Sequence, residues 1–158
     1  MIDHSLWGKT MSLYKHILLA TDLSVDSAVV SKKAAALAKL HHAKLSIVHI
    51  VEYVPPFYGV CEVAIDIELD TEQKLEHEAH KKIRVLAQEL GLEKPSIWVL
   101  SGDKHEEIVP LVKKHHIDLI VAGSHNHHSM HLLFGGSLPE IMLHDLSCDI
   151  IVINLGPL

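Results

Sequence analysis

The sequence is poor in cysteine and in aromatic residues, and it contains no long hydrophobic run. Its 158 residues include two cysteines, Cys61 and Cys148, and aromatic side chains make up 4% of the chain. Two cysteines cannot form the disulfide framework of a small secreted protein, so we expect reduced thiols and a cytoplasmic setting. The longest apolar stretches are short, such as Ile17–Ala20 and Leu119–Ala122, which argues against a membrane-spanning helix.

Basic residues are scarce relative to acidic ones. Lysine and arginine number 14 against 20 aspartates and glutamates, which gives a formal net charge of -6. Nucleic acids and anionic membranes attract basic surfaces, so we expect neither as a partner. The remaining composition, 48% hydrophobic and 22% charged, is that of an ordinary globular protein of one domain.

The first residues show no signal for secretion. They include an acid at position 3 and lack both an apolar core and a small-residue cleavage site. A second methionine, Met11, lies shortly before the first strand-like segment. We expect residues 1–12 to form a flexible extension and residues 13–158 to form the folded domain.

Two kinds of hydrophobic pattern alternate along the chain. Short runs rich in Ile, Val and Leu predict strands buried on both faces, at His16–Thr21, Ala43–Val51, Ser96–Leu100, Asp118–Ala122 and Asp149–Leu155. Stretches with a 3.6-residue period predict helices at Val30–Leu40, Thr71–Leu90 and Lys104–His115, with a fourth beginning near Ser137. The alternation predicts a single doubly wound α/β domain, in which helices cover both faces of a five-stranded parallel sheet.

Local signals mark the ends of these helices. Asp70 and Gln73 have the spacing of a capping box before the second helix, and Gly91 follows its last turn. The preceding segment Glu52–Leu69 contains prolines and a glycine, and we expect it to form a long connection. Asp103 can cap the third helix, whereas Pro110 lies too deep in it for the first turn and should kink it or remove a hydrogen bond.

In folds of this class, ligands bind beyond the carboxyl ends of the strands. The segments to consider are therefore Asp22–Ser24, after the first strand, and Gly123–Ser137, after the fourth. Gly123 ends a strand and Gly136 precedes a capped helix, so backbone N–H groups at both positions could hold a phosphate. Both glycines would equally serve tight turns, and spacing alone leaves the two interpretations open.

Four segments carry the landmarks of a known family: Tyr14–Ser24, Leu100–Asp103, Asp118–His125 and Asp149–Leu155. On these segments the sequence resembles the universal stress protein A family from Met11 onward. The resemblance implies a parallel sheet of strand order 3-2-1-4-5, a homodimer and a role in the response to starvation and stress.

The nucleotide-binding branch of that family carries the motif G-x2-G-x9-G-[S/T]. When the motif is aligned with this sequence, its defined positions fall on Gly123, Asn126, Gly136 and Ser137, so an asparagine replaces the second glycine. The resemblance implies phosphate contacts at these positions and at the backbone of Leu138. Asparagine tolerates the left-handed backbone better than other non-glycine residues, but its side chain could occupy the space of a phosphate oxygen.

The adenosine end of the site follows from the same resemblance. Asp22 matches the acid after the first strand, and Ile50 matches the position whose backbone meets the adenine. The implied cofactor is ATP with Mg. An acid at this place can instead cap the following helix, as Ser24 or Asp26 could also do.

Two functions therefore remain open. One is a stress-response dimer that binds ATP or a related adenine nucleotide as a regulatory ligand. The other is a nucleotide-free protein-interaction module with an unknown partner, as in the family's founding branch. We expect hydrolysis to be slow at most, because the sequence offers no evident general base or phosphoryl-stabilising arginine.

Histidines raise the question of a metal site. The chain has 15 of them, and His125, His127, His128 and His131 lie close together. No cysteine or acid joins this group at a familiar ligand spacing, so we expect no metal site.

The last predicted strand, Asp149–Leu155, lies at the sheet edge in the implied strand order. An apolar, unprotected edge favours pairing with a second copy of the chain. We therefore expect a homodimer through this strand, and a lysine in place of Ile151 or Ile153 should yield a monomer.

Overall fold

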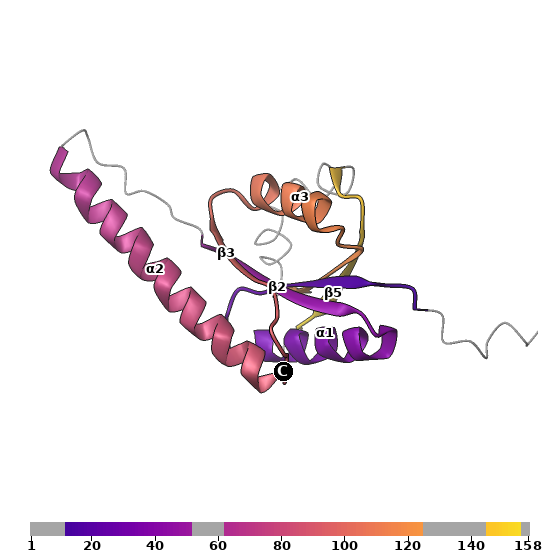
Figure 1. Ribbon diagram of the computed structural model, residues 1–158. Coiled ribbons are helices and arrows are strands. Elements are labelled where there is room, and N and C mark those ends of the chain that lie inside the picture. The colour runs from indigo at the N-terminus through magenta and orange to yellow at the C-terminus, as the bar shows by residue number, and fades with distance from the viewer. Residues whose placement is uncertain (1–11, 52–61, 125–144, 156–158) are drawn as a thin grey trace, which may run out of the picture.

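The computed structural model describes residues 12–51, 62–124 and 145–155. The strands in these ranges are β1 (His16–Ala20), β2 (Lys44–Val51), β3 (Ile97–Ser101), β4 (Leu119–Ser124) and β5 (Asp149–Asn154). The helices in these ranges are α1 (Ser27–His41), α2 (Glu62–Glu89) and α3 (Lys104–His115) (Figure 1).

The five strands form one sheet of order β3-β2-β1-β4-β5, and every neighbouring pair is parallel. This order confirms the predicted doubly wound fold. The chain runs outward from β1 through β2 to β3, then crosses to β4 on the other side of β1. The strand order therefore reverses at β1, and that is where a ligand site is expected in such sheets.

Helices cover both faces of the sheet, as the alternation of patterns predicted. Helices α1 and α2 lie on one face and α3 lies on the other (Figure 1). Ile17 and Leu19 of β1 join the same apolar core as Ile83 of α2, whereas Leu18 joins the core that contains Val112 of α3. Alternate residues of one strand thus face opposite helical layers. The fourth predicted helix lies outside the described residues.

Helix α2 begins earlier than predicted. It starts at Glu62, so the expectation of a connection up to Leu69 was wrong for residues 62–69, and Asp70 lies within the helix. Residues 62–69 contain no proline or glycine, and several of them are good helix formers. Three consecutive apolar residues, Val63–Ile65, are followed by an alternation of polar and apolar residues, so the segment shows no clear helical period. Helix α3 continues past Pro110, whose side chain is exposed.

Each of the three helices that the structure describes is followed by a residue in the left-handed conformation. These residues are His42, Gly91 and His116, with φ of 53°, 64° and 52°. In each case the next N–H donates to a carbonyl five residues earlier: Ala43 to Ala38 at 2.8 Å, Leu92 to Ala87 at 3.0 Å and Ile117 to Val112 at 3.1 Å. This is the Schellman arrangement, which satisfies carbonyl groups at the helix end. It confirms the predicted end of α2 at Gly91.

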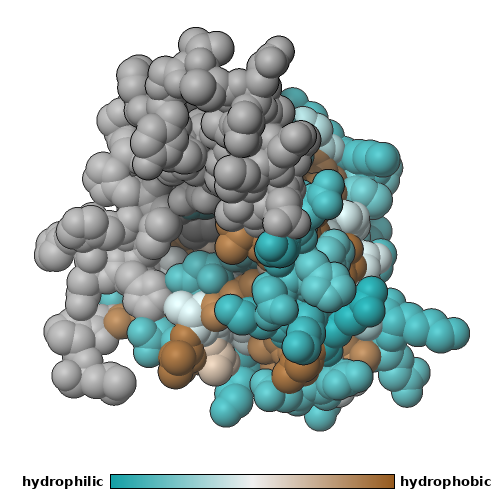
Figure 2. Space-filling view, turned by 90° about the vertical axis from the view of Figure 1, so that its left-hand side faces the viewer, coloured by the Kyte–Doolittle hydropathy of each residue, from teal (hydrophilic) through white to brown (hydrophobic). Residues whose placement is uncertain are grey.

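The surface that carries α2 is largely hydrophilic, and its hydrophobic residues form separate patches (Figure 2). Large apolar side chains exposed on the molecule include Val25 before α1 and Leu75 and Val85 of α2. Among the helices that the structure describes, none has both the length and the hydrophobicity to cross a lipid bilayer.

A buried histidine lies at the amino end of the central strand. His16 has both ring nitrogens within hydrogen-bond distance of partners: Nδ1 lies 2.9 Å from the carbonyl oxygen of His115, and Nε2 lies 2.8 Å from Oγ of Ser46. Burial lowers the pKa of the His16 imidazole, and the smaller effect of the His115 carbonyl opposes this change. The fold therefore favours the neutral ring.

The buried His16 predicts a pH-dependent stability. The unfolded chain takes up a proton on this residue more readily than the folded chain does, so its stabilising contribution is present above about pH 6.5 and is lost as the pH falls below that value. We expect the free energy of unfolding, measured with urea, to fall less between pH 7.5 and pH 5.0 in His16→Gln than in the wild type. The exposed His77, changed to Gln, serves as the control. An unchanged slope in His16→Gln would contradict this account.

Candidate functional site

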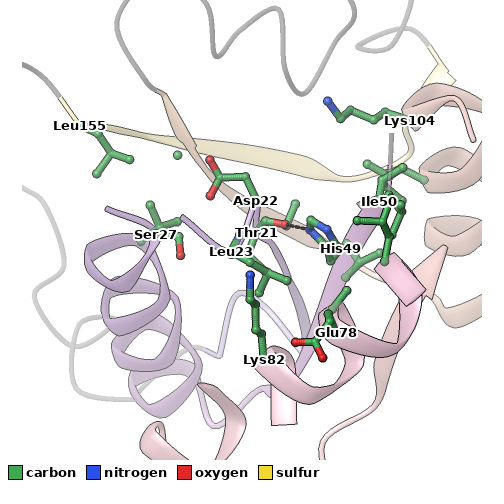
Figure 3. Close-up of a pocket in the computed structure, with 18 residues that line it drawn as sticks. Thr21, Asp22, Leu23, Ser27, His49, Ile50, Glu78, Lys82, Lys104 and Leu155 are labelled. Carbon is green, nitrogen blue, oxygen red and sulfur yellow. Dashed lines mark hydrogen bonds between the residues drawn. The ribbon is translucent and has the colours of Figure 1, made fainter. Parts of the chain in front are cut away.

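A cavity of about 420 Å³ lies at the carboxyl ends of β1, β2 and β4, where the strand order reverses (Figure 3). Residues from β1 and its following loop, from β2, and from helices α1, α2 and α3 line it, together with Gly123 of β4 and Leu155 after β5. Its size falls within the range of small-molecule sites in proteins.

Three of the predicted site residues meet around this cavity. Asp22, Ile50 and Gly123 come from the ends of three different strands, and all three line it. The other predicted site residues lie outside the described residues: Asn126, Gly136, Ser137 and Leu138. The same holds for the clustered histidines from His125 to His131.

The loop between β1 and α1 is tightly organised. The N–H of Thr21 donates to the carbonyl of Val48 at 3.0 Å, which continues the ladder between β1 and β2 by one residue. The Leu23 N–H donates to Oγ1 of Thr21 at 3.1 Å, and the Ser24 N–H donates to Oδ1 of Asp22 at 2.9 Å. These two bonds hold the loop in place beside the cavity.

Two further observations concern the role of this loop. Leu23 has a φ of 59°, which costs a non-glycine residue about 1 kcal/mol. Such strain is concentrated at functional sites. Asp26 is the N-cap residue of α1 but makes no capping bond with its side chain, and the described hydrogen bond of Asp22 stays within the loop before the helix. Asp22 thus forms a turn beside the cavity.

Gly123 is required by packing. A Cβ atom added there would lie 2.8 Å from Cγ2 of Val30 and 3.0 Å from Cδ1 of Leu155. Distances this short force a neighbouring atom to move. The close approach of α1 and of the chain after β5 therefore accounts for this glycine without a ligand. It supports the packing interpretation of the first motif position.

The walls of the cavity combine apolar and charged side chains. Val48 and Ile108 are among the buried apolar residues that line it. Charged lining residues from the helices are Glu78 and Lys82 of α2 and Lys104 of α3. Figure 3 shows Lys82 reaching from α2 toward the loop after β1, with Glu78 beside it. Sequence reasoning missed these helical residues, because nothing distinguishes them from other exposed positions of an amphipathic helix.

A histidine on β2 was also missed. His49 lines the cavity, and its Nδ1 lies 2.8 Å from the carbonyl oxygen of Thr21 (Figure 3). A signal for it exists in the sequence, since a polar ring interrupts the apolar run Ile47–Val51 just before Ile50. In buried strands, the ring nitrogens of a histidine usually form hydrogen bonds, either within the protein or with a ligand.

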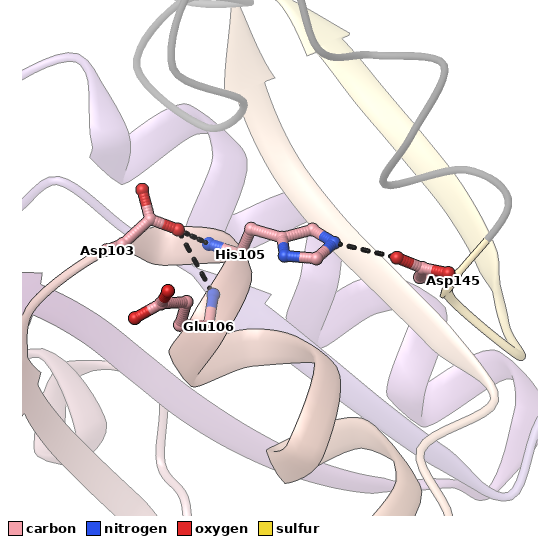
Figure 4. Close-up of polar contacts among 4 residues, drawn as sticks. All are labelled: Asp103, His105, Glu106 and Asp145. Atoms are coloured by element: carbon pink, nitrogen blue, oxygen red, sulfur yellow. Dashed lines mark hydrogen bonds and ion pairs between the residues drawn. The ribbon is translucent and has the colours of Figure 1, made fainter.

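The amino end of α3 is fixed by its cap and by a contact to the chain before β5. Oδ1 of Asp103 accepts hydrogen bonds from the N–H groups of His105 at 2.8 Å and Glu106 at 3.1 Å, which confirms the predicted cap. Nε2 of His105 lies 3.1 Å from Oδ2 of Asp145 (Figure 4). This exposed pair contributes little energy. It does join the start of α3, where Lys104 lines the cavity, to the chain before β5.

Two further observations concern metal and thiol chemistry in the described residues. Within residues 12–51, 62–124 and 145–155, no group of three or more potential ligands could hold a metal ion. Burial raises the pKa of the Cys148 thiol to about 11, with a smaller effect from Asp149. A thiol of this kind is unreactive at neutral pH.

Comparison with known proteins identifies the relatives of this chain. The profile of the Universal stress protein family matches residues 13–154. The chain belongs to the universal stress protein family. It is 38% identical over 140 residues to Universal stress protein A homolog 1 of Coxiella burnetii, covering 89% of this chain and 96% of that protein. It is 34% identical over 113 residues to Universal stress protein A of Escherichia coli, covering 71% and 76% of the two chains.

Solved structures of universal stress proteins share the fold. The structure of UspA from Lactobacillus plantarum superimposes with a TM-score of 0.68 at 24% identity and covers 89% of this chain and 97% of that chain. A universal stress protein in complex with cAMP has a TM-score of 0.55 at 21% identity, with 89% and 96% covered. The Archaeoglobus fulgidus protein in complex with dAMP has a TM-score of 0.51 at 22% identity, with 89% and 98% covered.

The packing at Gly123 can be tested by a double-mutant cycle in this universal stress protein. Gly123→Ala should lower the free energy of unfolding by about 1–3 kcal/mol, because the added methyl group overlaps Val30 and Leu155. In a Val30→Ala background, where one overlapping group is gone, the same change should cost at least about 0.5 kcal/mol less. Urea denaturation measures all four proteins. Strictly additive costs would show that the contact with Val30 does not constrain this position.

Proposed function

We propose that this universal stress protein binds ATP, or a related adenine nucleotide, as a regulatory ligand in the cavity at the ends of β1, β2 and β4. One observation carries the proposal: Asp22, Ile50 and Gly123, which the family resemblance assigns to adenosine and phosphate, line a single cavity. They lie far apart in the sequence, and the fold brings them together at the reversal of strand order.

The chemistry of the walls suits a nucleotide. Apolar side chains such as Val48 and Ile108 offer surfaces for a purine ring. The carboxylate of Asp22 can accept hydrogen bonds from ribose hydroxyl groups. Lys82 and Lys104 line the same cavity and bring positive charge to the phosphates, which Mg would accompany. The cAMP and dAMP complexes of relatives support the same ligand class.

The nucleotide is proposed as a regulatory ligand of a cytoplasmic stress response. Rapid phosphoryl transfer requires groups that stabilise charge on the transferred phosphoryl, commonly an arginine. No arginine is among the described residues that line the cavity. We therefore expect hydrolysis of the nucleotide to be slow at most. The nucleotide-bound protein would then persist long enough for a protein partner to recognise it.

Nucleotide binding is tested on freshly purified protein. Mass analysis of released ligand should find adenine nucleotide, and calorimetric titration of stripped protein with Mg-ATP should show one site per chain. Gly136→Glu should abolish binding by placing a carboxylate at the expected phosphate position. Asp22→Asn retains the acceptor for the Ser24 N–H but loses the charge, so it should weaken binding roughly tenfold. Asp26→Asn, at the start of α1, is the matched control.

The proposal would be overturned if the purified protein released no nucleotide and showed no binding of millimolar Mg-ATP. That result would favour the nucleotide-free interaction module of the founding branch.

We also propose a homodimer through β5, which lies at the sheet edge. The N–H of Asp149 donates to the carbonyl of Asp118 at 3.1 Å. Backbone groups alternate in direction along a strand, so those of Ile151 and Ile153 also face β4, and those of Val152 face away from the sheet. Outward-facing groups of this kind can pair with the same strand of a second copy.

The structure changes the choice of variant for this dimer. Ile151 and Ile153 pack against the core beneath α1 and α2, so a lysine at either position would disturb the fold itself. Val152 is 40% exposed, and its N–H faces the edge. Val152→Pro should remove an edge donor without breaking the ladder to β4, and should give a monomer by light scattering. Val152→Thr keeps the donor and should remain dimeric. A dimeric Val152→Pro protein would place the interface elsewhere.

A further inference from the structure

The imidazole of His49 has a fixed arrangement of donor and acceptor. Its Nδ1 lies 2.8 Å from the carbonyl oxygen of Thr21. A carbonyl oxygen can only accept, so Nδ1 carries the hydrogen of this bond. In the neutral ring, Nε2 therefore has a lone pair and accepts hydrogen bonds. The Thr21 backbone is itself held by its N–H bond to Val48, so the orientation of the ring is well determined.

Comparison with the other histidine of the central strands shows what is special about His49. His16 is buried, and both of its ring nitrogens are engaged, with His115 and with Ser46. His49 is half-buried and lines the cavity, and its Nε2 has no hydrogen-bond partner in the part of the chain that the structure describes. The ring of His16 thus forms both of its hydrogen bonds within the protein, whereas Nε2 of His49 remains as an acceptor at the cavity.

The position of His49 places this acceptor where the base of a nucleotide is expected. His49 directly precedes Ile50, whose backbone is assigned to the adenine, and its ring is bonded to the residue before Asp22 (Figure 3). Leu75 and Ala79 of α2 line the cavity as well and add apolar surface. A planar base bound among these residues would have one edge within reach of the imidazole.

We infer that His49 selects 6-aminopurines over 6-oxopurines, its Nε2 accepting a hydrogen bond from the exocyclic amino group of the base. This inference rests on the proposed nucleotide site and adds a residue that determines its specificity. Adenine presents an N–H donor at the six position, which complements the lone pair. Hypoxanthine and guanine present a carbonyl oxygen there, so two acceptors would face each other with no hydrogen between them.

The size of the expected preference follows from the cost of an unpaired polar group. A hydrogen bond lost within a partly buried site costs on the order of a five- to tenfold change in affinity. A repulsive pair of acceptors costs more than a merely missing donor. ATP should therefore bind roughly tenfold or more tightly than ITP, and purine riboside triphosphate, which lacks any six-substituent, should lie between them.

The experiment compares these three ligands by calorimetric titration with Mg at pH 8.0. All three carry the same ribose and triphosphate, so differences in affinity report the base alone. His49→Asn is the decisive variant: its amide nitrogen can replace Nδ1 in the bond to Thr21, but it has no acceptor at the Nε2 position. We expect it to reduce the ratio of ATP to ITP affinity to about one, with most of the loss in ATP binding.

His49→Gln provides the matched comparison. Its side-chain oxygen can reach the position of Nε2 and accept, so a preference for ATP should be retained while the bond to Thr21 is lost. The two variants thus separate recognition of the base by an acceptor at the Nε2 position from the hydrogen bond to the Thr21 carbonyl. Measurement of thermal unfolding confirms that each is folded, and the wild-type ligand series tests the inference even if a variant is not.

The outcomes are distinct. A wild-type protein that binds ATP and ITP equally, or a folded His49→Asn protein that keeps the preference, would overturn the role of His49 and leave the nucleotide site standing. A wild-type protein that binds none of the three triphosphates would overturn both this inference and the proposed function.

Discussion

The burial of β1 on every side is the constraint on which the rest of the structure depends. All five of its residues are buried, and Ile17, Leu18 and Leu19 have no exposed surface. The strand pairs with β2 and β4 at its edges and faces a helical layer on each side. A strand enclosed in this way can carry polar groups only at its ends. His16 therefore lies at one end, and Thr21 and Asp22 open the cavity at the other.

The two ends of the sheet use their polar groups differently. At the amino end, the ring of His16 is fully bonded within the protein, which favours its neutral form and contributes to stability. At the carboxyl end, the strained loop at Leu23 and the close packing at Gly123 shape a cavity whose walls carry charged side chains and the ring of His49. Their presence is what makes this end the candidate site.

Much of the fold could be predicted from the sequence. Strands buried on both faces appear as consecutive apolar residues, so β1 and β4 were found to within two residues at each end. The early start of α2 was missed because the apolar residues of its first turns show no clear helical period. The family resemblance led us to expect Asp22, Ile50 and Gly123 at one site, and the structure places them around one cavity, whereas Lys82, Lys104 and His49 were not expected there. Their place at the cavity depends on how helices and strands distant in the sequence pack together, and no local pattern encodes that.

The central claim is that an adenine nucleotide binds at the carboxyl ends of β1, β2 and β4. Amide chemical shifts of labelled protein, followed by NMR during titration with ATP, test it most directly. The account predicts that the largest changes fall on Thr21, Ile50 and Gly123, while amides at the amino ends of the same strands, such as Lys44, change little. Saturable changes centred on another surface, or no changes at all, would contradict it.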